Sequence, residues 1–213
     1  MIMRIAATAI VATFTAGVLH AATFTDRTTF QNAINISYIE DFESMDDGTY
    51  GFTGPITFGT GLTVSSESNQ LFSVGVGQST NPTQAIGSNT PDSDSLLMAL
   101  GGTFKAFGAD LFQNDGGGAQ TAGPVSFIIQ AFLGNVLVDS AVGNVLPNGG
   151  SFLGLTSASA FDNVRIFATG QDLFEVADNA TVGDANVVPL PAGLPLMLAG
   201  LGAFAALRRK RAA

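Results

Sequence analysis

The side chains that could do chemistry in this sequence are mostly carboxylates, and they gather in three places along the chain. Carboxylates among Asn and Gly turns suit Ca²⁺, which takes about six to eight oxygen ligands. A pair of carboxylates can also hydrolyse a glycosidic bond. Ordinary solvated acids on strands and turns are the alternative to both. The three groups are Glu40, Asp41, Glu43, Asp46 and Asp47; Asp92 and Asp94; and Asp162 with Asp178.

The composition excludes several other kinds of site. The sequence has no cysteine and one histidine, His20, so disulfides, Cys-ligated zinc, iron–sulfur clusters and thiol nucleophiles are excluded. With 46% hydrophobic and 12% charged residues, the chain is expected to fold rather than remain disordered. The formal net charge of -9 argues against a nucleic-acid partner, whose phosphates call for clustered Lys and Arg.

Residues 1–22 have the pattern of a secretory signal peptide. Arg4 precedes an apolar stretch from Ile5 to Leu19, and the small residues Ala21-Ala22 follow. A short positive region, an apolar core and a small-residue end predict Sec export and cleavage by signal peptidase; an uncleaved anchor or a buried helix is the alternative. Cleavage would remove His20, and with it Ser-His-Asp and Cys-His hydrolysis and His-ligated zinc.

The C-terminus carries a second apolar segment that ends in basic residues. The uncharged run 192–207 would span roughly 24 Å as a helix at about 1.5 Å per residue, and the residues just before it are also uncharged. A hydrocarbon core is about 30 Å thick, so the sequence predicts a transmembrane helix over 193–207. The basic residues at 208–211 favour a cytoplasmic C-terminus, which leaves residues 23–187 outside. A simple anchor, or a buried helix with a basic tail, is the alternative.

A short motif directly precedes this helix, so the chain ends in three parts: motif, apolar helix and basic stop. This ending resembles the VPLPA variant of the PEP-CTERM sorting signal. The resemblance implies processing by an exosortase-type membrane transpeptidase at the inner membrane of a Gram-negative bacterium. The ectodomain would then reach the periplasm, the cell surface or an extracellular matrix rich in exopolysaccharide. The motif is Val188, Pro189, Leu190, Pro191 and Ala192, and the stop is Arg208, Arg209, Lys210 and Arg211.

Residues 23–187 form the predicted ectodomain, and they carry three basic and all seventeen acidic side chains, a formal charge of -14. The sequence predicts a short helix over 27–34, capped by Thr25 or Asp26. Apolar or alternating runs separated by Gly, Asn, Asp, Ser and Pro then predict short strands and an all-β fold, a jelly-roll-like antiparallel β-sandwich. The expected strands are 38–42, 56–58, 62–66, 71–76, 95–99, 103–111, 125–133, 136–141, 151–156, 161–168 and 174–181, with a two-residue hairpin turn inside Leu133–Val136.

Phrases in this region, among them 38–43, 103–112 and 174–183, resemble the ectodomains common on PEP-CTERM proteins. Galactose-binding-like jelly rolls are similar, and they often hold a structural calcium ion between an early "DFE" segment and a late "DN" strand. By that resemblance the candidate calcium ligands are Asp41, Glu43 and Asp178. A further calcium site at Asp92 and Asp94 is a weaker hypothesis, and solvated acids are the alternative to both.

Three functions are compatible with these observations. The leading interpretation is a non-enzymatic, exported cell-envelope or matrix protein. The first alternative is a carbohydrate-binding module that tethers the cell to exopolysaccharide. Sugar rings stack best on Trp and Tyr, but the chain has no Trp and only Tyr38 and Tyr50, and no groove is evident from the sequence. The second alternative is a glycosidase that uses some pair among Glu40, Glu43, Glu67 and the aspartates.

Overall fold

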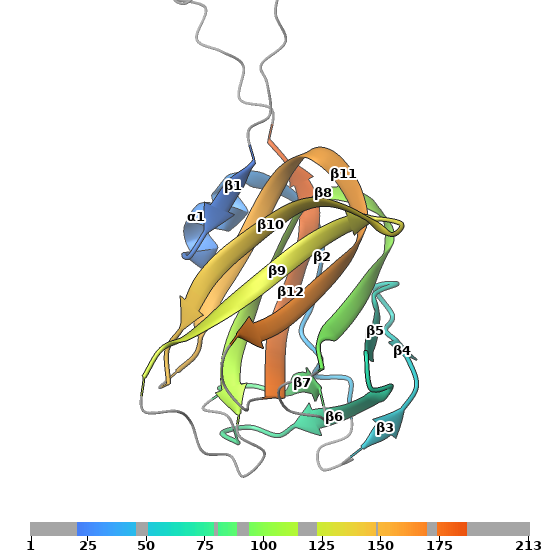
Figure 1. Ribbon diagram of the computed structural model, residues 1–213, viewed down its shortest axis with the longest axis vertical. Helices are drawn as coiled ribbons and strands as arrows, with labels where there is room; N and C mark the ends of the chain where they lie inside the picture. Colours follow the sequence, from blue (N-terminus) through green and yellow to red (C-terminus); the bar gives the residue numbers. More distant parts are fainter. Residues whose placement is uncertain are drawn as a thin grey trace, which may run out of the picture. The chain divides into compact units, whose positions relative to one another are not determined.

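The protein is described by a computed structural model, in which Leu19–Asn186 form one compact unit. Within that unit the structure describes residues 21–45, 51–78, 81–88, 94–114, 123–147, 149–169 and 174–186. These ranges hold one helix and antiparallel strands (Figure 1). The elements are β1 Ala22–Phe24, α1 Arg27–Asn32, β2 Ile34–Glu40, β3 Phe52–Thr53, β4 Ile56–Thr57, β5 Thr63–Ser66, β6 Gln70–Val74, β7 Ala85–Ser88, β8 Leu96–Asn114, β9 Val125–Leu133, β10 Val136–Val145, β11 Ser151–Thr169 and β12 Phe174–Ala185.

The strands form two facing layers, and the long strands β8 and β11 take part in both. In the first, here called the β9 layer, β5 pairs with the start of β8, which pairs with the end of β11, followed by β9 and β10. In the second, the β12 layer, β1 pairs with the start of β11, the end of β8 pairs with β12, and β12 pairs with β2 and β7. The predicted all-β antiparallel sandwich is therefore confirmed.

Both long strands bend where they pass from one layer to the other. Gly101 lies in the bend of β8 with a φ of +71°, a backbone conformation that glycine adopts without steric cost. A Cβ at Gly101 would lie 2.8 Å from the carbonyl oxygen of Gly61, so the chains also meet too closely for a side chain. Opposite this bend, the β11–β8 register shifts between Thr156 and Asn163, as expected for bulges that turn a strand through a corner.

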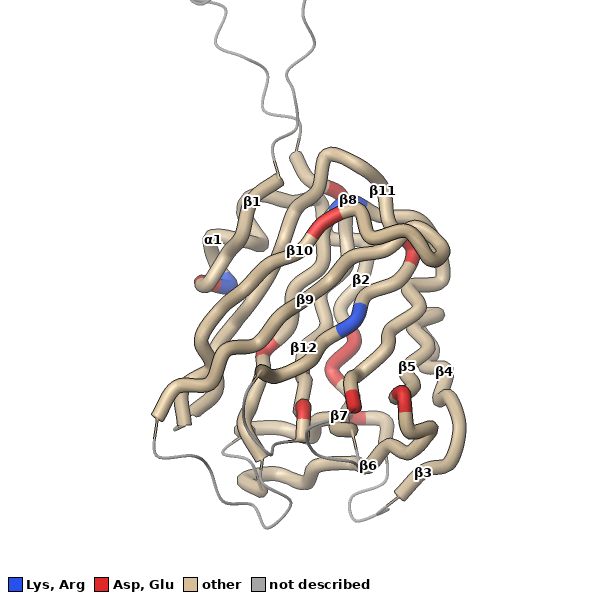
Figure 2. The backbone as a smooth tube through the Cα atoms, viewed as in Figure 1, with Lys and Arg blue, Asp and Glu red and all other residues tan. Residues whose placement is uncertain are grey.

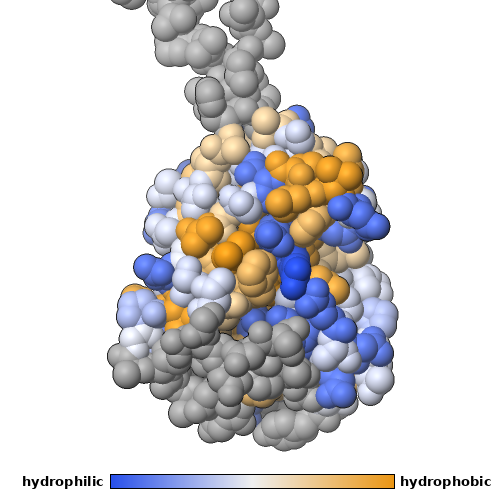
Figure 3. Space-filling view, viewed as in Figure 1, coloured by the Kyte–Doolittle hydropathy of each residue, from blue (hydrophilic) through white to orange (hydrophobic). Residues whose placement is uncertain are grey.

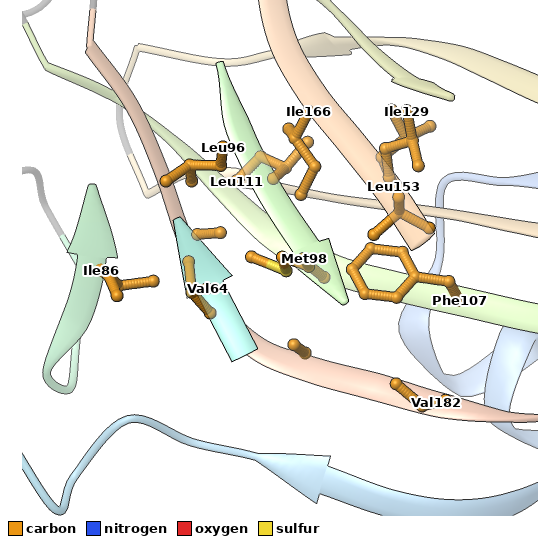
Figure 4. Close-up of a cluster of buried hydrophobic side chains, with 14 of the residues drawn as sticks. Val64, Ile86, Leu96, Met98, Phe107, Leu111, Ile129, Leu153, Ile166 and Val182 are labelled. Atoms are coloured by element: carbon orange, nitrogen blue, oxygen red, sulfur yellow. The ribbon is translucent and has the colours of Figure 1, made fainter. Parts of the chain in front are cut away.

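The hydrophobic core fills the space between the layers (Figure 4). Phe107 and Leu153 from the β12 layer and Ile129 and Ile166 from the β9 layer are all at most 1% exposed. Burial of such side chains contributes about 1.5–3 kcal/mol each. Strand β9 shows the underlying pattern, because its inner residues alternate strictly with half-exposed ones.

The helix is confirmed, and its N-cap is Asp26, whose Oδ1 accepts the backbone N–H of Thr29 at 2.7 Å. It ends at Asn32 rather than at residue 34 because Ile34 already begins β2. The predicted hairpin turn is also confirmed: β9 ends at Leu133, and Gly134 has the positive φ that the first turn position requires.

Several strand boundaries differ from the prediction. The runs 95–99 and 103–111 are parts of the single strand β8, and 151–156 and 161–168 are parts of β11. The sequence prediction missed β1, β3 and β7. Residues 1–20 and 187–213 lie outside the described residues, and with them the predicted transmembrane helix and all of the predicted signal peptide except Ala21 and Ala22, the second of which begins β1. No helix in the described part of the chain is long and apolar enough to cross a membrane.

Candidate functional site

The outer face of the β9 layer presents alternate residues of four strands in register. One row across the sheet is Thr63, Ala99, Asn163 and Phe132. Two positions further along the strands, a second row is Ser65, Leu97, Arg165 and Gln130. Residues of the row between them, such as Met98, point into the core and are buried. The alternation of the strands therefore places polar and apolar side chains together on one outward surface.

This surface is hollowed into an open groove of about 460 Å³ that ends at the β9–β10 hairpin. Its floor is formed by strand residues, and its far end by the turn residues Gly134 and Asn135. The space-filling view shows an apolar surface near this hairpin, where Leu133, Val136 and Leu137 are exposed (Figure 3). The lining residues are Thr63, Ser65, Leu97, Met98, Ala99, Phe132, Gly134, Asn135, Asn163, Val164 and Arg165.

Arg165 is held in one orientation from three sides. Its Nε donates to Ser95 Oγ at 3.0 Å, and its Nη2 lies 3.0 Å from both carboxylate oxygens of Glu67. The guanidinium carbon also lies 4.9 Å from the ring centroid of Phe167, within cation–π range. The side chain is still 35% exposed, so a preorganised guanidinium faces the groove.

Asp162 organises the hairpin end of the groove. Its Oδ1 accepts the backbone N–H of Gly134 at 2.9 Å and the side-chain Nδ2 of Asn163 at 2.6 Å. One carboxylate oxygen thus ties the turn to β11 and fixes the amide of Asn163. Fixing that amide lowers the conformational entropy that a ligand would have to remove.

The groove lining combines hydrogen-bonding groups with apolar surface. Its lining residues supply amide, hydroxyl and guanidinium groups beside an aromatic ring and aliphatic side chains, and they include no carboxylate. Glu40, a candidate acid for glycoside hydrolysis, is buried and accepts a hydrogen bond from Thr60 Oγ1 at 2.6 Å. Glu67, another candidate, is paired with Arg165.

Two of the three candidate calcium ligands lie near each other. Asp178 is fully buried; its Oδ2 accepts from Thr83 Oγ1 at 2.5 Å, and its Oδ1 accepts from the Asn179 backbone N–H at 2.6 Å. Glu43 Oε1 accepts a hydrogen bond at 2.7 Å from the backbone N–H of Gln84, the residue that follows Thr83. Burial raises the pKa of Asp178 above its usual range, and the negative charge of Glu43 adds to that increase in pKa.

The third candidate, Asp41, is exposed on the turn that follows β2, where its Oδ1 accepts a hydrogen bond from the Glu43 backbone N–H at 3.2 Å. The buried Nε2 of Gln84 has no hydrogen-bond partner in the described chain. The two carboxylates match only part of a calcium ligand set, which needs more oxygens, and the unpaired Gln84 nitrogen is a hydrogen-bond donor that cannot add to it. The described residues contain no group of three acidic, His or Cys side chains that could hold a metal, so calcium stays a prediction.

The other candidate residues are either occupied or outside the described ranges. Asp94 is buried and accepts from the backbone N–H groups of Ser68 and Ser95, at 3.0 and 2.9 Å. Asp92 lies outside the described residues. So do the sorting motif, Val188, Pro189, Leu190, Pro191 and Ala192, and the basic stop, Arg208, Arg209, Lys210 and Arg211.

The sequence prediction found neither the groove nor its residues. Apolar and polar residues alternate in 161–167, which indicates that Asn163 and Arg165 of β11 face outward. This was the sequence signal available for these two groove residues. What it could not supply is the register, because Thr63, Ala99, Phe132 and Asn163 come from four separate parts of the chain.

Comparisons with known proteins give limited information. No family model matches the chain, and no curated protein matches it. Among solved structures, the chain is similar to the C-terminal family 22 carbohydrate-binding module of Clostridium thermocellum Xyn10B, with 16% identity, a TM-score of 0.46, and coverage of 73% of this chain and 98% of that one. It is also similar to CBM32-3 from a family 31 glycoside hydrolase of Clostridium perfringens, with 13% identity, a TM-score of 0.32, and coverage of 46% and 74%. No function is inferred from likenesses this distant.

Proposed function

We propose that this chain is a non-catalytic carbohydrate-binding module, with a jelly-roll-like fold, of an exported cell-envelope or matrix protein. The observation that carries the proposal is the groove on the β9 layer, where Arg165, Asn163 and Asn135 lie beside Phe132 and Leu97.

The groove residues match the chemistry of a sugar. A sugar ring has hydroxyl groups around its edge, which pair with amides, hydroxyls and guanidinium groups, and C–H faces that pack on apolar side chains. Asn135, Asn163 and Arg165 supply the first kind of contact, and Phe132 and Leu97 supply the second. Binding sites commonly combine a mostly apolar lining with a few fixed polar groups.

The route to the ligand is proposed from the terminal segments. The predicted signal peptide over 1–22 directs export, and the VPLPA-type ending over 188–213 directs anchoring and exosortase processing. Such a route would deliver the module to the exopolysaccharide outside the cell. A structural calcium ion beside Glu43 and Asp178 is proposed only as a stabilising feature, since Glu43 lies on the turn after β2, Asp178 lies within β12, and neither lines the groove.

The test is a glycan array followed by calorimetry on the host's own polysaccharides. We expect affinity that falls by about fivefold or more in Asn135→Ala and Arg165→Ala, since a truncated contact in a binding centre costs more than about 1 kcal/mol. The matched control is Asn144→Ala, which removes an exposed amide of β10 outside the groove. Absence of binding to every glycan, or an equal loss of affinity in the control, would contradict the proposal.

Mass spectrometry of the protein from its host tests the proposed processing of the C-terminal segment, since an intact basic terminus at 208–211 would contradict exosortase processing.

A further inference from the structure

We infer that the groove takes an uncharged polysaccharide, lying across the strands, and rejects chains that carry carboxylate or sulfate groups. The inference rests on the proposed function, because it names the class of glycan for the same groove. It follows from the charges around the groove, from the charge of the whole ectodomain and from the direction of the lining rows.

The groove has no uncompensated positive charge for an anionic sugar. Among the described residues that line it, Arg165 alone is charged, and Glu67 neutralises it through the ion pair at 3.0 Å. Asp162 stands at the hairpin end, hydrogen-bonded to the lining residues Gly134 and Asn163. Behind the guanidinium, Ser95 links Arg165 to the buried carboxylate of Asp94. The one cation of the lining is therefore paired with Glu67, and two further carboxylates, Asp94 and Asp162, are hydrogen-bonded to residues next to Arg165 or in the lining.

Acidic side chains also outnumber basic ones in the rest of the ectodomain. Residues 23–187 contain only three basic side chains against seventeen acidic ones. Arg27 forms an ion pair with Asp110, and neither Arg27 nor Lys105 lines the groove. Figure 2 shows the few basic segments set among more numerous acidic ones. Such a field repels an approaching polyanion, and like charges brought together at an interface are strongly unfavourable.

The lining rows set the direction of the ligand. The groove begins at Thr63 and Ser65 on β5, crosses β8 and β11 and reaches Phe132 and the hairpin on β9. Four adjacent strands about 4.8 Å apart span roughly 14 Å, which is the length of a short oligosaccharide. An extended chain would therefore run perpendicular to the strands, with Arg165 and Asn163 at its centre.

The experiment compares an acidic polysaccharide with its carboxyl-reduced derivative, which has the same backbone without charge. Binding of the full chain in detergent is measured by calorimetry at low salt with a chelator, so that divalent cations cannot bridge carboxylates. We expect the reduced polymer to bind at least about tenfold more tightly than its parent, and the difference to shrink as salt screens the repulsion. Equal binding of both polymers, or binding of the parent that weakens with salt, would overturn the inference while leaving the proposed function standing. No binding to any neutral or acidic glycan would overturn both.

Two variants that each remove one negative charge test whether the discrimination against acidic polymers arises at the groove. Glu67→Gln removes the charge that compensates Arg165 but keeps a hydrogen-bond acceptor for it, so the affinity for the acidic parent relative to that for the reduced polymer should rise by about fivefold. Asp184→Asn changes the net charge equally but lies exposed at the end of β12, outside the groove, and should shift neither by more than about twofold. An equal gain in both variants would show that net charge alone decides, and would contradict the role given to the groove. Thermal melting confirms that each variant is folded.

Discussion

The molecule treats its polar side chains in two different ways. On the β9 layer, Arg165 and Asn163 are held by neighbouring side chains but keep their faces toward the groove. Around β12, a second set is closed on itself and is called here the Asp178 network. Its members are Arg27, Glu43, Thr83, the Gln84 backbone, Asp110, Asp178 and Asn179, joined by the ion pair and hydrogen bonds given above and by the bond from Asn179 Nδ2 to Asp110 Oδ2.

The two regions differ in whether their polar groups are fully hydrogen-bonded within the protein. Buried polar groups are costly unless they are paired, and both oxygens of the fully buried Asp178 are paired within the protein. Asn135, in contrast, is exposed on a turn at the end of the groove. The Asp178 network should therefore support the fold, and the groove should support recognition. Variants of the two regions should separate stability from binding.

The largest expected effect is on stability, in Asp178→Ala. The change leaves the donors of Thr83 and Asn179 without their acceptor, which should lower the free energy of unfolding by about 3 kcal/mol. For a chain of this size that corresponds to a fall in Tm of roughly 6–12 °C. Thermal melting gives the stability, and calorimetry below the transition should give unchanged glycan affinity. A folded variant that has lost glycan binding would break the proposed separation of the two regions.

Calcium tests whether the Asp178 network has a second role. If Glu43 and Asp178 share an ion, calcium at about ten times its Kd should stabilise the folded state by about 1.4 kcal/mol, a rise in Tm of roughly 3–6 °C. Asp178→Asn should abolish the rise, and magnesium at the same concentration should give a smaller one, because it demands a tighter geometry. An unchanged Tm in millimolar calcium, or an equal rise in the variant, would contradict the site.

The fold was predictable where a local pattern determines a local structure. Strand β9 has the predicted bounds because Val125, Phe127, Ile129 and Ala131 alternate with more exposed residues and Gly134 follows. Strand β7 was missed because its sequence, Ala-Ile-Gly-Ser, is buried at every position and therefore shows no alternation.

The bend and the groove were not predictable for a related reason. Gly101 was read as part of a break between two strands, but here a glycine bends one strand through the corner between layers. Whether a glycine ends a strand or bends it depends on the close approach of Gly61, some forty residues earlier. The groove depends in the same way on strand register, which is decided by packing across the sheet rather than by neighbours in sequence.

The smallest expected effect concerns Glu175, a buried carboxylate outside both regions. Ser88 Oγ donates to its Oε2 at 2.7 Å and the Ala168 backbone N–H donates to its Oε1 at 3.0 Å. Burial raises the pKa of Glu175, and the charge of Asp94 adds to that rise in pKa. The folded state therefore binds this proton more tightly than the unfolded state, so its contribution to stability is full in acid and is lost as pH rises through the folded pKa.

Glu175→Gln removes that titration while keeping an acceptor for Ala168. At acidic pH the variant should be less stable than the wild type by about 1 kcal/mol, and the gap should narrow or reverse as pH rises from about 4 to 8. Urea denaturation across that range measures the difference, with the exposed-site variant Asp184→Asn as the comparison. A gap that widens with pH would mean that the hydrogen bonds to Glu175 lower its pKa more than burial raises it, and would contradict the expectation.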